Sequence, residues 1–146
     1  AFPCYDEPSF KALFDITIKR LPDFSETLSN MPIKTRGPLT DGRIAETFHT
    51  TPKTSTYLLA FIVSHYKEVA TGTDLNRPFK IYARDNAKLT GDWSLDIGER
   101  LLEEMEKITD VPYYGMALNM DMKQAAIPDF SAGAMENWGL LTYREA

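Results

Sequence analysis

The organisation of this chain depends on one stretch near its C-terminal end, Gly133-Ala134-Met135-Glu136-Asn137-Trp138-Gly139-Leu140-Leu141-Thr142-Tyr143-Arg144. Two glycines, which disfavour a helix, flank the carboxylate of Glu136. The residues that follow, 140–143, favour a β-strand. The pattern predicts a loop that leads into an edge strand, with Glu136 at the mouth of the loop.

Such an arrangement suits the binding of a peptide by its amino terminus. An exposed edge strand offers backbone N–H and C=O groups to an extended peptide, and a carboxylate at its end can hold the terminal ammonium by a charge-assisted hydrogen bond. An internal peptide segment has no ammonium and would leave a buried Glu136 unpaired, which costs several kcal/mol. The alternative interpretation of Glu136 is a surface residue on a turn.

The composition is that of a globular chain. Hydrophobic residues make up 43% of the 146 residues, enough for a packed core. The formal net charge is −5, and acidic and basic residues are interspersed without a basic stripe, which argues against nucleic-acid binding. The longest apolar run, Tyr57–Val63, is too short to span a bilayer. The single cysteine, Cys4, has no basic neighbour, and we expect it to be buried and structural.

The first half of the chain has an all-β pattern. Apolar and polar residues alternate within Lys11–Arg20, which predicts a half-buried strand. Residues 21–42 are predicted to be mostly loop, with one short strand near 29–33, and 44–50 to be a weaker strand. The apolar run 57–64 has the length and composition of a strand that is buried on both faces.

The pattern changes in the second half. After a short predicted strand at Phe79–Ala83, apolar residues recur every three or four positions from 93 to 108, which predicts an amphipathic helix. Asp92 is a candidate N-cap, and Pro112 prevents continuation of the helix. Alternation within 116–125 predicts another half-buried strand, whose methionines pack in the core rather than bind a soft metal. The predicted apolar face of the helix consists of Ile97, Leu101, Leu102, Met105 and Ile108.

Four stretches, in this order, resemble the signatures of one enzyme family. They are Pro3–Pro8 (PCYDEP), Thr51–Phe61 (TPKTSTYLLAF), Pro128–Phe130 (PDF) and Gly133–Asn137 (GAMEN). On these motifs the chain resembles the gluzincin aminopeptidases, the M1 family that includes aminopeptidase N, and it is most similar to the insect midgut members. The match runs over nearly the whole chain.

The resemblance implies an α+β fragment that spans two domains. Residues 1–70 would form the C-terminal part of a β-rich, saddle-like N-terminal domain, and residues 71–146 the start of a thermolysin-like catalytic domain. Residue 1 is not Met and the last residues follow a strand-like run directly, so we expect a piece of a longer enzyme. A piece that divides two domains loses partner strands, and we expect it to be poorly soluble by itself.

The resemblance also assigns roles within the motif. Glu136 would be the catalytic-site residue that anchors the amino terminus of the substrate, and Gly133 and Ala134 would offer backbone contacts to it. Met135 would face the pocket for the first side chain, where its flexible thioether suits apolar or long residues. Asn137 either fixes the loop by local hydrogen bonds or is a simple turn residue.

The metal that such enzymes use is expected to be absent from this chain. Zinc peptidases of this type bind the ion through His-Glu-x-x-His on a helix, which brings two imidazoles one turn apart to one metal. The histidines here, His49 and His65, do not have this spacing. The resemblance implies that the zinc ligands, and a tyrosine that stabilises the transition state, lie beyond Ala146. The chain alone should therefore bind no catalytic zinc and hydrolyse nothing.

Two functions from different classes follow from the resemblance. The first is a fragment of a zinc-dependent aminopeptidase that removes amino-terminal residues from peptides, in which a metal-bound water attacks the first peptide bond. The alternative is a segment of a receptor ectodomain that binds a protein partner, such as a bacterial pore-forming toxin. Insect relatives are lipid-anchored at the extracellular face of the cell membrane, whereas cytosolic relatives share the same motifs.

Overall fold

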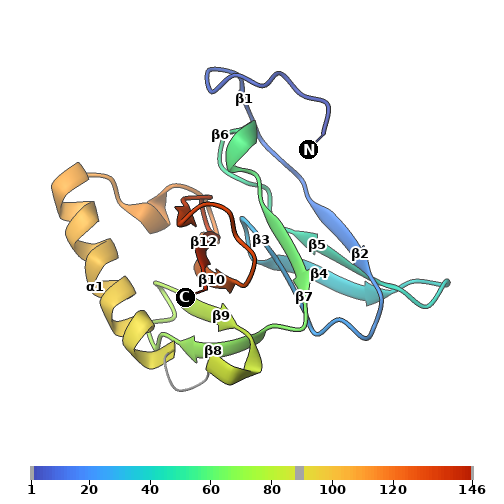
Figure 1. Ribbon diagram of the computed structural model, residues 1–146. Helices are drawn as coiled ribbons and strands as arrows, with labels where there is room; N and C mark the ends of the chain where they lie inside the picture. Colours follow the sequence, from blue (N-terminus) through green and yellow to red (C-terminus); the bar gives the residue numbers. More distant parts are fainter. Residues whose placement is uncertain (1, 88–90, 146) are drawn as a thin grey trace.

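The computed structural model describes residues 2–87 and 91–145. Strands gather in two regions, and a long helix lies against the second region (Figure 1). This arrangement confirms the predicted α+β class. The N-terminal region contains β1 (Lys11–Ala12), β2 (Thr17–Arg20), β3 (Glu26–Ser29), β4 (Ile33–Pro38), β5 (Ile44–Phe48), β6 (Thr54–Ser55), a 3₁₀ turn (Thr56–Leu58) and β7 (Phe61–Ser64). The C-terminal region contains β8 (Lys67–Thr71), β9 (Phe79–Ala83), a 3₁₀ turn (Asp85–Ala87), α1 (Gly91–Thr109), a 3₁₀ turn (Tyr113–Gly115), β10 (Met122–Ile127), β11 (Ala134–Met135) and β12 (Leu141–Arg144).

The N-terminal region is built from small antiparallel sheets. The strand order is β2–β5–β4 in the largest, and β3–β7 and β1–β6 form two-stranded sheets. Phe14, Ile16 and Ile18 are half-buried and the residues between them are exposed, which confirms the predicted alternation. The predicted strand is interrupted between β1 and β2, because the N–H and C=O of Phe14 bond to the hydroxyl and N–H of Thr51 (2.9 and 3.1 Å).

Two predictions for this region were wrong. The stretch 21–42 contains two strands, β3 and β4, which lie on either side of Pro32. Proline has no N–H for a strand ladder, so one strand could not run through it. The apolar run 57–64 is not one strand buried on both faces: it begins in a 3₁₀ turn, and Phe61 in β7 is 66% exposed. Within the described residues β7 pairs only with β3, which leaves its other edge open.

The prediction for Cys4 was also wrong. Cys4 is a free, exposed cysteine. All of residues 2–10 are exposed, because this segment lies over the surface and its rings contact one another, as Tyr5 and Phe10 do at 5.3 Å between centroids. A buried, structural role for the thiol is therefore excluded within the described structure.

The C-terminal region is organised around a five-stranded sheet in the order β11–β12–β10–β9–β8. The three inner strands are parallel to one another, and both outer strands run antiparallel to their neighbours. The strand predicted at 79–83 is confirmed as β9. The strand predicted at 116–125 starts only at Met122, because a 3₁₀ turn and the left-handed Asn119 (φ 62°) precede it. Met120 and Met122 are core residues, as predicted.

The helix α1 confirms the prediction of an amphipathic helix but begins earlier than expected. It starts at Gly91, so Asp92 lies within the first turn rather than at the N-cap, where its charge still favours the helix dipole. The helix ends before Asp110, which adopts a left-handed φ of 54°, and Pro112 follows.

The face of α1 that packs on the sheet differs from the predicted face. Gly98 is buried, and a Cβ there would lie 2.8 Å from the ring of Phe79 in β9, so the sheet approaches the helix where no side chain intervenes. Leu95 and Leu102 complete this contact. Leu102 belongs to the predicted face and does pack on the sheet, whereas Leu101, Met105 and Ile108 of that face are 60%, 53% and 76% exposed. Apolar periodicity alone could not tell which of two apolar stripes faces the sheet.

Apolar clusters join the two regions next to the motif. Leu140 is fully buried and packs with Leu28 of β3, Tyr82 of β9 and Ala125 of β10. Trp138 packs against a second cluster, which contains Met31, Phe48 and Met120. Because both clusters draw on both regions, the segment after Glu136 is held where the two regions meet (Figure 1).

Candidate functional site

The motif forms the outer edge of the five-stranded sheet. Ala134 and Met135 make up β11 and pair with Tyr143 and Thr142 of β12. The prediction that residues 140–143 form the edge was wrong, because β12 lies between β10 and β11. The edge is β11 itself. Glu136 follows it directly, so the carboxylate stands after the edge strand, whereas the sequence predicted it before an edge strand at 140–143.

The five motif residues differ in exposure. Gly133, Ala134 and Glu136 are exposed, Met135 is half-buried and Asn137 is buried. The expected burial of Glu136 is therefore not seen, since within the described residues β11 pairs only with β12 and its outer side is uncovered. A Cβ placed on Gly133 would meet no atom within 4 Å, so another backbone can approach there closely.

The segment before β11 is fixed by one side chain. The guanidinium of Arg144 in β12 donates to the carbonyl oxygens of Phe130 (2.8 Å) and Ala132 (3.2 Å), and to that of Ser131. The backbone N–H of Arg144 donates to the carbonyl of Gly133 (2.9 Å). A single arginine therefore orders the loop that leads into the edge strand.

The segment after Glu136 is a tight, buried turn. The N–H of Leu140 donates to the carbonyl of Asn137 (2.9 Å), and Gly139 has a φ of +75°, which a type II turn requires at its third residue. The carbonyl of Asn137 thus closes the turn by a local backbone bond. A Cβ on Gly139 would lie 1.7 Å from the carbonyl oxygen of Asn30, so only glycine fits.

Asn30 holds this turn from the N-terminal region. Its side chain is buried, and its amide nitrogen donates to the carbonyl oxygens of Trp138 (2.7 Å) and Leu58 (2.8 Å). Its amide oxygen accepts the N–H of Ala60 (2.9 Å). Asn30 and Trp138 are 108 positions apart, and sequence reasoning did not identify the contact.

Tyr113 holds the same turn from the opposite side. Its hydroxyl accepts the N–H of Gly139 (3.0 Å) and donates to the carbonyl of Asp121 (2.9 Å). Burial, together with the negative charge of Asp121, raises the pKa of Tyr113 far above its usual range. The hydroxyl therefore keeps the proton that the second bond needs. Sequence reasoning missed Tyr113 as well, because an aromatic residue after a helix is more often simply a packing residue.

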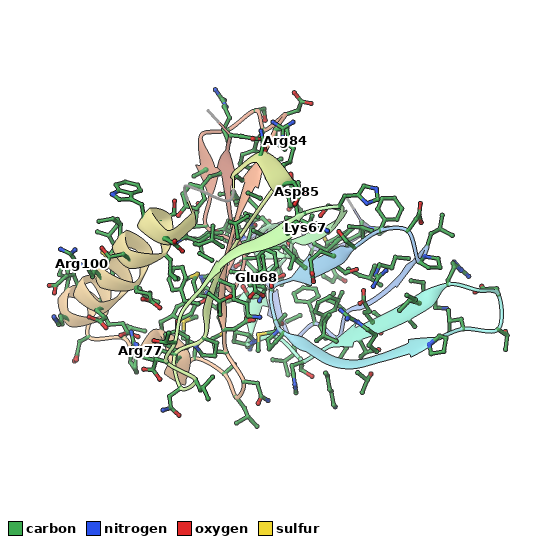
Figure 2. The ribbon with its side chains drawn as sticks, turned by 90° about the horizontal axis from the view of Figure 1, so that it is seen from below. Lys67, Glu68, Arg77, Arg84, Asp85 and Arg100 are labelled. Atoms are coloured by element: carbon green, nitrogen blue, oxygen red, sulfur yellow. The ribbon has the colours of Figure 1, made fainter. Side chains whose placement is uncertain are left out.

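One cavity lies between strands of the two regions. It has a volume of about 700 Å³ and is bounded by β3 and β4 on one side and by β9 and the start of β10 on the other. On the side of the C-terminal region its lining contains two ion pairs, Lys80 with Glu68 (2.8 Å) and Lys123 with Asp121. Figure 2 shows Glu68 where β8 passes the N-terminal strands. Glu136 is not among the lining residues, so the cavity is not part of the candidate site.

The residues present do not fit a zinc ion. His49 Nδ1 lies 3.3 Å from the amide nitrogen of Asn119, whereas His65 stacks on Phe24 at 5.0 Å between ring centroids. Across residues 2–87 and 91–145 no three side chains of His, Cys, Asp or Glu gather in a way that could hold a metal. Zinc ligands outside this chain therefore stay a prediction.

Models of two domains of one protein family match the chain. The Peptidase M1 N-terminal domain matches residues 1–58, and the Peptidase family M1 domain matches residues 93–146. The chain belongs to peptidase family M1. This confirms the resemblance that the motifs suggested. The domain boundary predicted near residue 70 falls between the two matched regions, inside β8, and stays a prediction.

Relatives match along the entire chain. The membrane alanyl aminopeptidase of Manduca sexta is 69% identical over 146 residues, and that of Heliothis virescens is 49% identical over 150. Endoplasmic reticulum aminopeptidase 1 of Homo sapiens is 44% identical over 146 residues. Each match covers 100% of this chain, which spans 15% of the length of the relative. In the part of the chain that the structure describes, no helix is both long and apolar enough to cross a membrane.

Proposed function

We propose that this chain is the part of a metallo-aminopeptidase that recognises the free amino terminus of a peptide, with Glu136 as the anchoring carboxylate. The observation that carries the proposal is the position of Glu136 at the end of the edge strand β11. Membership of peptidase family M1, and relatives that are named aminopeptidases, support it.

The geometry suggests how a peptide would bind. An extended peptide would add to the outer side of β11 by main-chain hydrogen bonds with Gly133 and Ala134. Its terminal ammonium would then meet the carboxylate of Glu136, and its first side chain would lie near Met135. An internal segment of a peptide cannot place an ammonium there. If further parts of the protein cover β11, Glu136 becomes buried. Binding of an internal segment is then strongly disfavoured, because the buried carboxylate would have no ammonium to pair with.

The rest of the catalytic apparatus is proposed to lie outside residues 1–146. Zinc and its ligands belong to that part, and the residues described here contribute substrate binding and orientation only. Attachment to the extracellular face of a membrane by a lipid anchor, and binding of a bacterial toxin, are finer predictions of the resemblance, and no described contact bears on either.

The test is to replace Glu136 by Gln and by Ala in the full-length protein that contains this chain. Inhibition constants are measured for an amino-acid amide and for the same amide without its α-amino group. Loss of a charge-assisted bond predicts that the amine-bearing inhibitor binds about 100-fold more weakly, while the other is unaffected. Glu103→Gln, at an exposed glutamate of α1, is the matched control and should change neither constant. Equal constants for Glu136→Ala and the unmodified protein would exclude the anchoring role.

A further inference from the structure

We propose that Asn30 and Tyr113 are positioning residues, which fix the peptide unit between Trp138 and Gly139 and thereby the direction in which Glu136 faces. The inference rests on the proposed function of Glu136. It adds that the N-terminal region, through Asn30, takes part in recognising the amino terminus of the substrate.

The two residues hold the two polar ends of one peptide unit. The carbonyl oxygen of Trp138 accepts from the Asn30 amide at 2.7 Å, and the N–H of Gly139 donates to the Tyr113 hydroxyl at 3.0 Å. Rotation of this peptide plane would break both bonds at once. A type II turn converts to a type I turn by this same rotation, so the pair locks the turn type.

These two hydrogen bonds hold a peptide unit that begins two residues after Glu136, and they leave the turn little conformational freedom. Asn30 is 2% exposed, and both its amide nitrogen and its amide oxygen are hydrogen-bonded. The backbone of Gly139 lies directly against that of Asn30. Among residues 2–87 and 91–145 no hydrogen bond or ion pair holds the exposed carboxylate of Glu136, so a rigid turn at 137–140 sets where that carboxylate points.

The chemistry of the side chain at position 30 matters as well as its size. The amide nitrogen faces two carbonyl oxygens, those of Leu58 and Trp138, so position 30 needs a donor. In Asn30→Asp a carboxylate would face both acceptors and repel them. A buried polar group without a partner is costly, so the turn should move away from that residue.

Ser29 provides a matched control on the neighbouring residue. It is 1% exposed, and its hydroxyl donates to the carbonyl of Ala60 (2.9 Å). Ser29→Ala therefore removes one buried hydrogen bond to the segment 58–60, where Asn30→Ala removes two. It leaves the bond to Trp138 in place.

The test uses the full-length protein and the inhibitor pair described for Glu136. Asn30→Ala and Tyr113→Phe should each weaken binding of the amine-bearing inhibitor about 10-fold relative to the inhibitor without the amine, the equivalent of about one hydrogen bond in a buried site. Ser29→Ala should leave the ratio of the two affinities, amine-bearing over amine-free inhibitor, unchanged. A purely structural role would instead weaken both inhibitors equally. Tyr113→Phe keeps its ring in the core, so it decides the matter if Asn30→Ala does not fold.

The possible outcomes separate the two proposals. If Glu136→Ala lowers the affinity ratio of the amine-bearing to the amine-free inhibitor, the anchoring role stands. If Asn30→Ala and Tyr113→Phe then leave that ratio unchanged, the positioning role is overturned. An unchanged ratio in Glu136→Ala would overturn the anchoring role itself, whatever the other variants do. Selective weakening of the amine-bearing inhibitor in Ser29→Ala would also count against the positioning role, because the Ser29 hydroxyl bonds to Ala60 and not to the turn.

Discussion

The two sides of Glu136 are built in opposite ways. On the N-terminal side, residues 130–135 are mostly exposed and are fixed by hydrogen bonds from Arg144. On the C-terminal side, residues 137–142 are mostly buried and are held by Asn30, Tyr113 and two apolar clusters. The difference shows how an edge strand can stay open for a ligand while the residue at its end keeps a defined place.

Two glycines give the largest expected contrast. Gly139→Ala should destabilise the turn by about 3 kcal/mol, because alanine is strained at φ +75° and its Cβ would collide with Asn30. Gly133→Ala should change the stability of the edge by no more than about 0.5 kcal/mol, since a Cβ meets nothing there. Hydrogen exchange of the amides of residues 133–142 in the full-length protein measures both. Equal effects of the two variants would show that the two sides of Glu136 do not differ in how tightly they are packed.

Removal of the arginine that orders the open side should have a smaller effect. Arg144→Ala should destabilise residues 130–133 by about 1 kcal/mol, because the lost hydrogen bonds lie at the surface and water can replace them. The amides of residues 137–140 should exchange as before. Faster exchange throughout both segments would show that the two sides form one cooperative unit instead of two.

Met135 should give the smallest effect. Met135→Ala should change the preference for the first residue of the peptide by about threefold, with long apolar residues losing most, because a flexible thioether makes only modest contacts. Steady-state rates with alanyl and leucyl anilides would measure this in the full-length protein. A preference that does not change would place the first side chain away from Met135.

Local patterns predicted the elements that local chemistry determines. The periodicity of apolar residues and the position of helix-breaking residues were enough to predict three elements. These are the alternation around Ile16, the strand at 79–83 and the helix that ends before Pro112. The motif also predicted an edge strand next to Glu136, although the strand that forms the edge was misassigned.

Features that depend on distant partners could not be predicted. The buried face of α1 is chosen by Phe79 packing on Gly98, and periodicity does not encode which neighbour is present. Cys4 is exposed because its segment lies over the surface. The turn after Glu136 depends on Asn30, and nothing in a single sequence joins two residues 108 positions apart.

Glu136 is proposed to receive the amino group of the substrate at the open edge of the sheet. The most direct measurement is a crystal structure of the full-length protein with a bound amino-acid amide. We predict that the α-amine lies within about 2.7–2.9 Å of a carboxylate oxygen of Glu136, the range of a charge-assisted hydrogen bond. An amine held by other residues, with Glu136 still in solvent, would contradict it.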